Sequence, residues 1–121
     1  FTLTATDANR FAIRIAREIT QRSKILVFHY CYHGTVDESF ATLENGVVGP
    51  RRGNVGPPVN PAETTRVVEF NDLNDLEDAL KHHDVACVLA EPAMTNAGII
   101  LPDEGYWVDA RELARRYGSL L

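Results

Sequence analysis

The chain carries residue types suited to ligand chemistry in four short stretches, of which the first is Thr4–Thr6. Small and hydroxyl residues stand there directly before a predicted helix, where backbone N–H groups without a helical partner can bind a phosphate. The simpler interpretation is that Thr6 caps the helix and that Asp7 favours its first turn. Asp7 also disfavours an anion unless its carboxylate points away. No glycine-rich fingerprint occurs here, so neither a nucleotide loop nor a dinucleotide fold is indicated.

The second stretch, Phe28–Gly34, follows a predicted strand, and ligands of α/β sheets bind beyond the carboxyl ends of strands. Tyr32 offers a flat ring for stacking, and His33 titrates near neutral pH. Aromatic core packing is an equally good interpretation. A third is a zinc site, because His29, Cys31 and His33 would share one face of an extended segment, although no further ligand pair with the usual spacing accompanies them.

The third stretch follows a long apolar run and contains Glu91, Pro92 and Asn96. Pro92 stops the hydrogen-bond ladder of a strand, so Glu91 stands at the carboxyl end of that strand. The Glu91 carboxylate and the Asn96 amide can hydrogen-bond a ligand at this place. The alternative is that Glu91 only stabilises its own loop.

The fourth stretch, residues 44–61, is rich in glycine and proline. This composition does not suit the interior of a regular element, so we expect a long surface loop. A loop of this length in a compact domain is usually functional or mobile. Arg51 and Arg52 lie within it. They either bind an anionic substrate or partner or form a solvated pair.

Alternating helices and strands are expected to position these stretches. An amphipathic helix is predicted at 7–21, where Phe11, Ile15 and Ile19 recur at every fourth residue. The other predicted elements are strands at 24–28, 66–70 and 85–90, helices at 73–82 (capped by Asn71 and Asp72) and 105–117, a short extended piece at 99–101 and the start of a strand at 119–121. This order predicts an α/β fold, a three-layer sandwich with a mostly parallel sheet, in a single domain over residues 1–121.

The composition narrows the classes of function. The 121 residues are 45% hydrophobic and 24% charged, as in a globular domain with a real core. The net charge of −5 is a poor match to nucleic acid or to an anionic membrane. No apolar run approaches the roughly 20 residues that cross a bilayer. The two cysteines, Cys31 and Cys87, are too few for a secreted disulfide framework, so a reduced, cytoplasmic protein is expected.

Four motifs occur along the chain in a fixed order. They are Thr4-Ala5-Thr6-Asp7-Ala8, Cys31-Tyr32-His33-Gly34, Phe70-Asn71-Asp72-Leu73 and Glu91-Pro92 with Asn96. Together they resemble the class III pyridoxal-phosphate aminotransferases, and most closely the branch of glutamate-1-semialdehyde aminomutase and the β-amino-acid aminotransferases. The similarity extends over essentially all 121 residues, although Ala5 stands where the family usually has glycine.

The resemblance implies part of the large domain of a fold-type I enzyme, with a site for pyridoxal 5'-phosphate. The backbone of Ala5 and Thr6, with the Thr6 hydroxyl, would hold the cofactor phosphate. Tyr32 would stack on the pyridine ring, and His33 and Gly34 would shape that turn.

The resemblance also implies that Glu91 lies under the cofactor and that Asn96 reaches toward its phenolic oxygen or the substrate. In this family a carboxylate that pairs with the pyridine nitrogen follows the next strand, and the Schiff-base lysine comes later. Lys24 and Lys81 are the only lysines here, and neither matches the family's lysine motif. No catalytic residue is therefore assigned, and the 121 residues alone are expected to be an inactive piece of a longer enzyme.

The implied activity of the longer enzyme is the transfer or shift of an amino group on a small-molecule amino acid, in a homodimer. The alternative is a small non-catalytic α/β module that binds a phosphorylated aromatic ligand or acts through dimerisation. The amino donor and acceptor, and the choice between aminomutase and transaminase, do not follow from this stretch.

Overall fold

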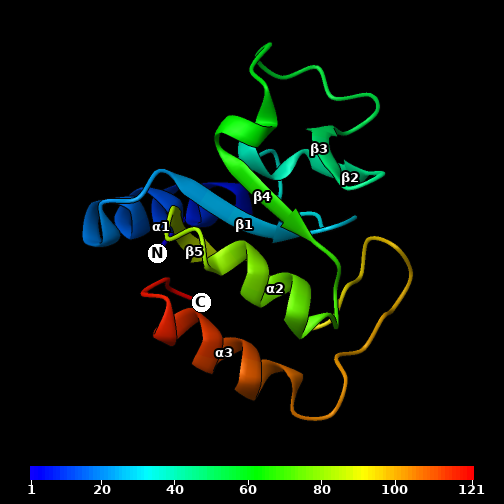
Figure 1. Cartoon of the computed structure of the whole chain (residues 1–121). Coiled ribbons are helices and arrows are strands. Elements are labelled where there is room, and N and C mark those ends of the chain that lie inside the picture. The colour runs from blue at the N-terminus through cyan, green and yellow to red at the C-terminus, as the bar shows by residue number, and fades with distance from the viewer.

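The computed structural model describes residues 1–121, and its elements are labelled in Figure 1. The helices are α1 (Ala5–Thr20), α2 (Leu73–Leu80) and α3 (Tyr106–Arg116), with 3-10 turns at Asp37–Ser39 and Pro61–Glu63. The strands are β1 (Lys24–Phe28), β2 (Ala41–Glu44), β3 (Val47–Pro50), β4 (Thr65–Val68) and β5 (Val85–Val88). None of the helices has both the length and the apolar character that crossing a membrane requires.

The main sheet has the strand order β4-β1-β5, and both outer strands run parallel to β1. Nearly every residue of β1 and β5 is buried, so both faces of the sheet are covered. α2 and α3 pack together on one face, and α1 lies against the other (Figure 1). The predicted three-layer α/β fold with a parallel sheet is confirmed.

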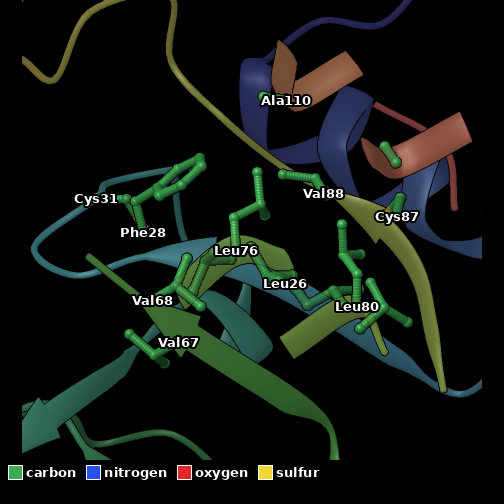
Figure 2. Packing of buried hydrophobic residues seen from close by; sticks show 14 of the residues in the cluster. Leu26, Phe28, Cys31, Val67, Val68, Leu76, Leu80, Cys87, Val88 and Ala110 are labelled. Atoms are coloured by element: carbon green, nitrogen blue, oxygen red, sulfur yellow. The ribbon is translucent and has the colours of Figure 1, made fainter. Parts of the chain in front are cut away.

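The core between the sheet and α2 fixes the strand ends in place. Figure 2 shows Leu76 and Leu80 of α2 beside Leu26 and Val68 of the sheet, and all four side chains are at most 1% exposed. Burying each such side chain stabilises the fold by about 1.5–3 kcal/mol. The loops that leave these strands therefore start from a rigid frame.

The first helix begins earlier than the sequence predicts. Thr4, rather than Thr6, is the N-cap, and its Oγ1 accepts a hydrogen bond from the Asp7 N–H at 3.1 Å. Thr2, Thr4 and Thr6 carry the same capping chemistry, so residue type alone does not select among them. The consequence is that Ala5 and Thr6 lie in the first turn of α1.

The apolar stripe of α1 faces outward. Phe11, Ile15 and Ile19 are 57%, 57% and 65% exposed, whereas Ile13 and Ala16 are buried against the sheet. The four-residue spacing therefore indicates the helix correctly but not the face that packs. Ile13 and Ala16, three residues apart, pack against the sheet instead. The small side chain of Ala16 allows the helix to approach the sheet closely.

Residues 44–61 hold more regular structure than their composition indicates. β2 and β3 pair antiparallel, with Glu44 opposite Val47, around a turn at Asn45 and Gly46. Both turn residues have positive φ, 53° and 77°, which is the geometry that Asn-Gly favours in a tight hairpin. Irregular loop is confined to residues 51–60.

An ion-pair cluster joins the amino ends of the three parallel strands. Asp84, just before β5, accepts hydrogen bonds from Arg66 Nε and Nη2 at 2.7 and 2.8 Å, and its carboxylate lies 3.6 Å from Lys24 Nζ. The hydrogen bonds from Arg66 lower the pKa of the Asp84 carboxyl below its ordinary value of 3.8.

The first prediction concerns Asp84→Asn in the full-length protein. Because the pKa of Asp84 is lower in the folded state, its stabilising contribution is present above the ordinary value and is lost as the pH falls through the lowered pKa. Asp84→Asn should therefore reduce the free energy of unfolding by less than about 1 kcal/mol at pH 7, since the pair is partly solvated. Urea unfolding at pH 7 and pH 3 measures this, and a difference between the proteins that grows toward pH 3 would contradict it.

Candidate functional site

The loop after β1 contacts both the first turn of α1 and the loop after β5. Residues 29–36 follow β1, and residues 89–96 follow β5. Three hydrogen bonds join these segments: Thr35 N–H to Thr6 Oγ1 at 3.1 Å, Tyr32 N–H to Glu91 Oε1 at 3.3 Å, and Asn96 Nδ2 to the Tyr30 carbonyl at 3.0 Å. The first three of the stretches singled out by sequence are thus parts of one place in the fold.

The first turn of α1 presents donors that the chain itself does not use. The backbone N–H groups of Ala5 and Thr6 have no acceptor, and Thr6 Oγ1 accepts from Thr35 N–H, which leaves its own proton free to donate. The Asp7 carboxylate accepts a hydrogen bond from Thr4 Oγ1 at 2.8 Å and is held at the cap. Three donors therefore gather at the positive end of a 16-residue helix, an arrangement that suits a phosphate.

Gly34 lies directly against this helix end. A Cβ atom at position 34 would collide with the Thr6 hydroxyl, and the φ of Gly34 is +76°, in the left-handed region. Space and backbone conformation both require glycine here. The close approach seats the Tyr32 loop on the first turn of α1.

Tyr32 presents a partly exposed ring from this loop. The residue is 50% exposed, and its ring meets the Phe40 ring edge-on with 6.4 Å between centroids. The backbone is held by the Tyr32 N–H to Glu91 and by the Thr35 N–H to Thr6. An aromatic ring on a loop fixed at two points is a surface on which a planar ligand can stack.

Glu91 and Asn96 connect the loop after β5 to the Tyr32 loop. Glu91 Oε2 accepts from the backbone N–H and the hydroxyl of Thr95, at 3.1 and 2.5 Å. Asn96 donates to the carbonyl of Tyr30, a residue with a positive φ of 63°. Glu91 therefore stabilises its own loop and also holds the backbone of the Tyr32 loop. The Asn96 amide oxygen has no donor within the chain.

His33 is a buried residue of the loop after β1. It is 6% exposed, and its Nε2 has no hydrogen-bond partner. Burial lowers the pKa of the His33 imidazole, which favours the neutral form of the ring. No group of three His, Cys, Asp or Glu side chains is placed to hold a metal ion, so the geometry does not support a zinc site at His29, Cys31 and His33.

Two contributors to the site have little signal in the sequence. Arg51 Nη2 donates to the Cys31 carbonyl at 2.6 Å, so the interpretation of Arg51 and Arg52 as a solvated pair is wrong for Arg51, although Arg52 is exposed. Asn9 Nδ2 donates to the His33 carbonyl at 3.0 Å. Both contacts join residues at least 20 positions apart, which no local pattern reveals.

The chain matches the family model described as Aminotransferase class-III over residues 1–121. Among curated relatives, the glutamate-1-semialdehyde 2,1-aminomutase of Saccharolobus islandicus is 40% identical over 124 residues, which cover 100% of this chain and 29% of that protein. The chain therefore spans less than a third of the length of the relatives it matches.

Solved structures agree with the family model. A glutamate-1-semialdehyde-aminomutase from Pseudomonas aeruginosa PAO1 matches with a TM-score of 0.94 and 50% identity, over 98% of this chain and 27% of that chain. A variant of that enzyme in complex with PMP matches with a TM-score of 0.92 and 51% identity, over 96% and 26% of the two chains.

The second prediction compares Gly34→Ala with Gly46→Ala in the full-length protein. Gly46 has nearly the same φ, +77°, but no atom within 4 Å of an added Cβ, so it isolates the cost of the backbone conformation. Gly34→Ala should reduce the free energy of unfolding by about 1–3 kcal/mol more than Gly46→Ala, because the added methyl also displaces Thr6. Urea unfolding of both variants measures the difference, and equal losses would show that the contact with Thr6 is not tight.

Proposed function

Because the chain belongs to the class III aminotransferase family, we propose that the protein containing it transfers or shifts an amino group on an amino acid with pyridoxal 5'-phosphate as cofactor. Enzymes of this family use that cofactor. The observation that carries the proposal is the contact of Gly34 with Thr6. This contact brings the loop that carries Tyr32 onto the helix end to which we assign the phosphate.

The first turn of α1 fits the phosphate of this cofactor. The N–H groups of Ala5 and Thr6 and the Thr6 hydroxyl supply three donors, and the helix dipole favours a negative charge there. Ala5 replaces the usual glycine, but the phosphate contact uses its backbone N–H. The Asp7 carboxylate, engaged by Thr4, is part of the cap.

The loop above this turn fits the pyridine ring. Tyr32 supplies a stacking surface, and its backbone is held by the hydrogen bond from its N–H to Glu91 and by the contact of Gly34 with the helix. We assign to His33, which is buried and whose pKa is lowered by that burial, a role in shaping the turn. Asn96 is the residue we assign to the phenolic oxygen or the substrate, through its unpaired amide oxygen or by exchange of its bond to Tyr30.

Pyridoxal phosphate, when bound, supplies a carbonyl that captures an amine and a ring that accepts electrons. The two lysines of the chain are engaged elsewhere: Lys24 Nζ donates to the Ala62 carbonyl at 2.9 Å, and Lys81 Nζ donates to Asp78 at 2.7 Å. We therefore assign the lysine that holds the cofactor and moves the proton to residues outside 1–121. The 121 residues alone are expected to lack turnover.

The carboxylate that pairs with the pyridine nitrogen is also assigned outside these residues. Leu120 forms a parallel bridge with Cys87; its N–H donates to the Ala86 carbonyl at 3.0 Å, and its carbonyl accepts from the Val88 N–H at 2.8 Å. We propose that a fourth parallel strand continues from Leu120 along β5. An open groove of about 990 Å³, lined in part by Val88 and Leu121, runs beside this edge.

The remaining features of the proposal concern the whole protein. We propose a cytoplasmic homodimer that acts on a small-molecule amino acid. Its net charge over these residues, −5, gives no support for nucleic acid as a partner. Two buried, free cysteines, Cys31 and Cys87, are compatible with a reducing compartment.

The third prediction concerns the affinity of the full-length protein for pyridoxal 5'-phosphate. Thr6→Val removes a hydrogen bond to a charged group and should raise the dissociation constant by about tenfold or more, whereas Thr6→Ser should restore most of the affinity. Thr20→Val, at the other end of α1, is the matched control and should bind normally, since Thr20 only donates to the Ala16 carbonyl. Titration of the apoprotein, followed by the absorbance of the cofactor, measures these constants.

The same titration tests the proposed function. Wild-type protein that binds the cofactor and exchanges an amino group with an amino acid supports it. No binding by the wild-type protein would overturn it. Binding without any amino-group exchange would instead support the non-catalytic α/β module.

A further inference from the structure

One peptide group in the site is held by opposite charges at its two ends. The peptide between Cys31 and Tyr32 accepts a hydrogen bond at its carbonyl oxygen from Arg51 Nη2, at 2.6 Å. Its N–H donates to Glu91 Oε1 at 3.3 Å. The cation thus lies at the negative end of the peptide dipole and the anion at the positive end, which favours both contacts.

Arg51 differs from the rest of its loop. It is the only residue of 51–60 that is half-buried, whereas the other nine are exposed. Its guanidinium carbon lies 5.9 Å from the centroid of the Phe40 ring, and the Phe40 and Tyr32 rings make an edge-to-face contact. Arg51 therefore reaches Tyr32 by two routes, the Cys31 carbonyl and the Phe40 ring.

We propose that Arg51 is a positioning residue for the cofactor, which acts by holding the Cys31–Tyr32 peptide against Glu91 and so fixes the ring of Tyr32. The inference rests on the proposed function, in which Tyr32 stacks on the pyridine ring. It adds to that function a residue from the loop 51–60, which none of the motifs of the site includes.

The geometry explains how Arg51 would act through Tyr32. The Tyr32 ring is attached to the Cα atom that directly follows this peptide group, so a rotation of the peptide plane moves the ring. Aromatic stacking depends on the distance and tilt of the two rings. A ring that is already in position loses less conformational freedom when the ligand binds. Without Arg51 the carbonyl loses its donor, while Glu91 keeps its bonds to Thr95.

The fourth prediction compares Arg51→Met with Arg51→Lys in the full-length protein. Arg51→Met should weaken binding of pyridoxal 5'-phosphate about tenfold and change the visible circular dichroism of the bound cofactor, because the ring is less fixed. Arg51→Lys should restore most of the affinity, since an ammonium group can donate to the same carbonyl. Arg52→Met is the control and should match the wild-type protein, because Arg52 is exposed.

The same substitution in a variant that lacks the Tyr32 ring distinguishes a positioning role of Arg51 from a general effect on the fold. In Tyr32→Ala, the Arg51→Met substitution should change the dissociation constant less than about twofold, because coupled residues are not additive. A purely structural role would weaken binding equally in both backgrounds.

The outcomes distinguish this inference from the function on which it rests. Unchanged affinity and dichroism in Arg51→Met would overturn the inference and leave cofactor binding intact. An equal loss in the presence and absence of the Tyr32 ring would also overturn it. Failure of the wild-type protein to bind the cofactor would overturn the proposed function and the inference together.

Discussion

The contact between Gly34 and the Thr6 hydroxyl is the constraint on which the candidate site depends. It brings the loop after β1, which carries Tyr32, onto the first turn of α1. A side chain at position 34 would separate them. Glycine is therefore required at position 34 both because the loop lies so close to α1 and because the backbone there has a positive φ.

The charged contacts of the main sheet gather at its two opposite ends. The Arg66–Asp84 pair and Lys24 join the amino ends of the strands, while Glu91 and Arg51 act at the loops beyond their carboxyl ends. The buried frame between these ends lets short loops hold ligand-binding groups without large elements of their own. The site thus uses a general property of parallel α/β sheets.

Local sequence patterns predict the elements and helix caps that depend on neighbouring residues. The strand at 24–28 was predicted with its observed bounds, and Asp72 caps α2 through hydrogen bonds to Asn74 and Asp75 N–H. The spacing of apolar residues does not predict the packed face of α1, because Ile13 rather than Ile15 packs against the sheet. The Asn45-Gly46 pair is typical of a tight hairpin turn. The high glycine and proline content of the surrounding residues favoured a loop prediction instead. The hydrogen bond from Arg51 to the Cys31 carbonyl joins residues 20 positions apart, so no local pattern predicts it.

The most direct test is an experimental structure of the full-length protein with pyridoxal 5'-phosphate bound. We expect phosphate oxygens within hydrogen-bond distance of the Ala5 and Thr6 N–H groups and of the Thr6 hydroxyl, with the pyridine ring against the face of Tyr32. A phosphate bound away from α1, or a ring that does not touch Tyr32, would contradict it.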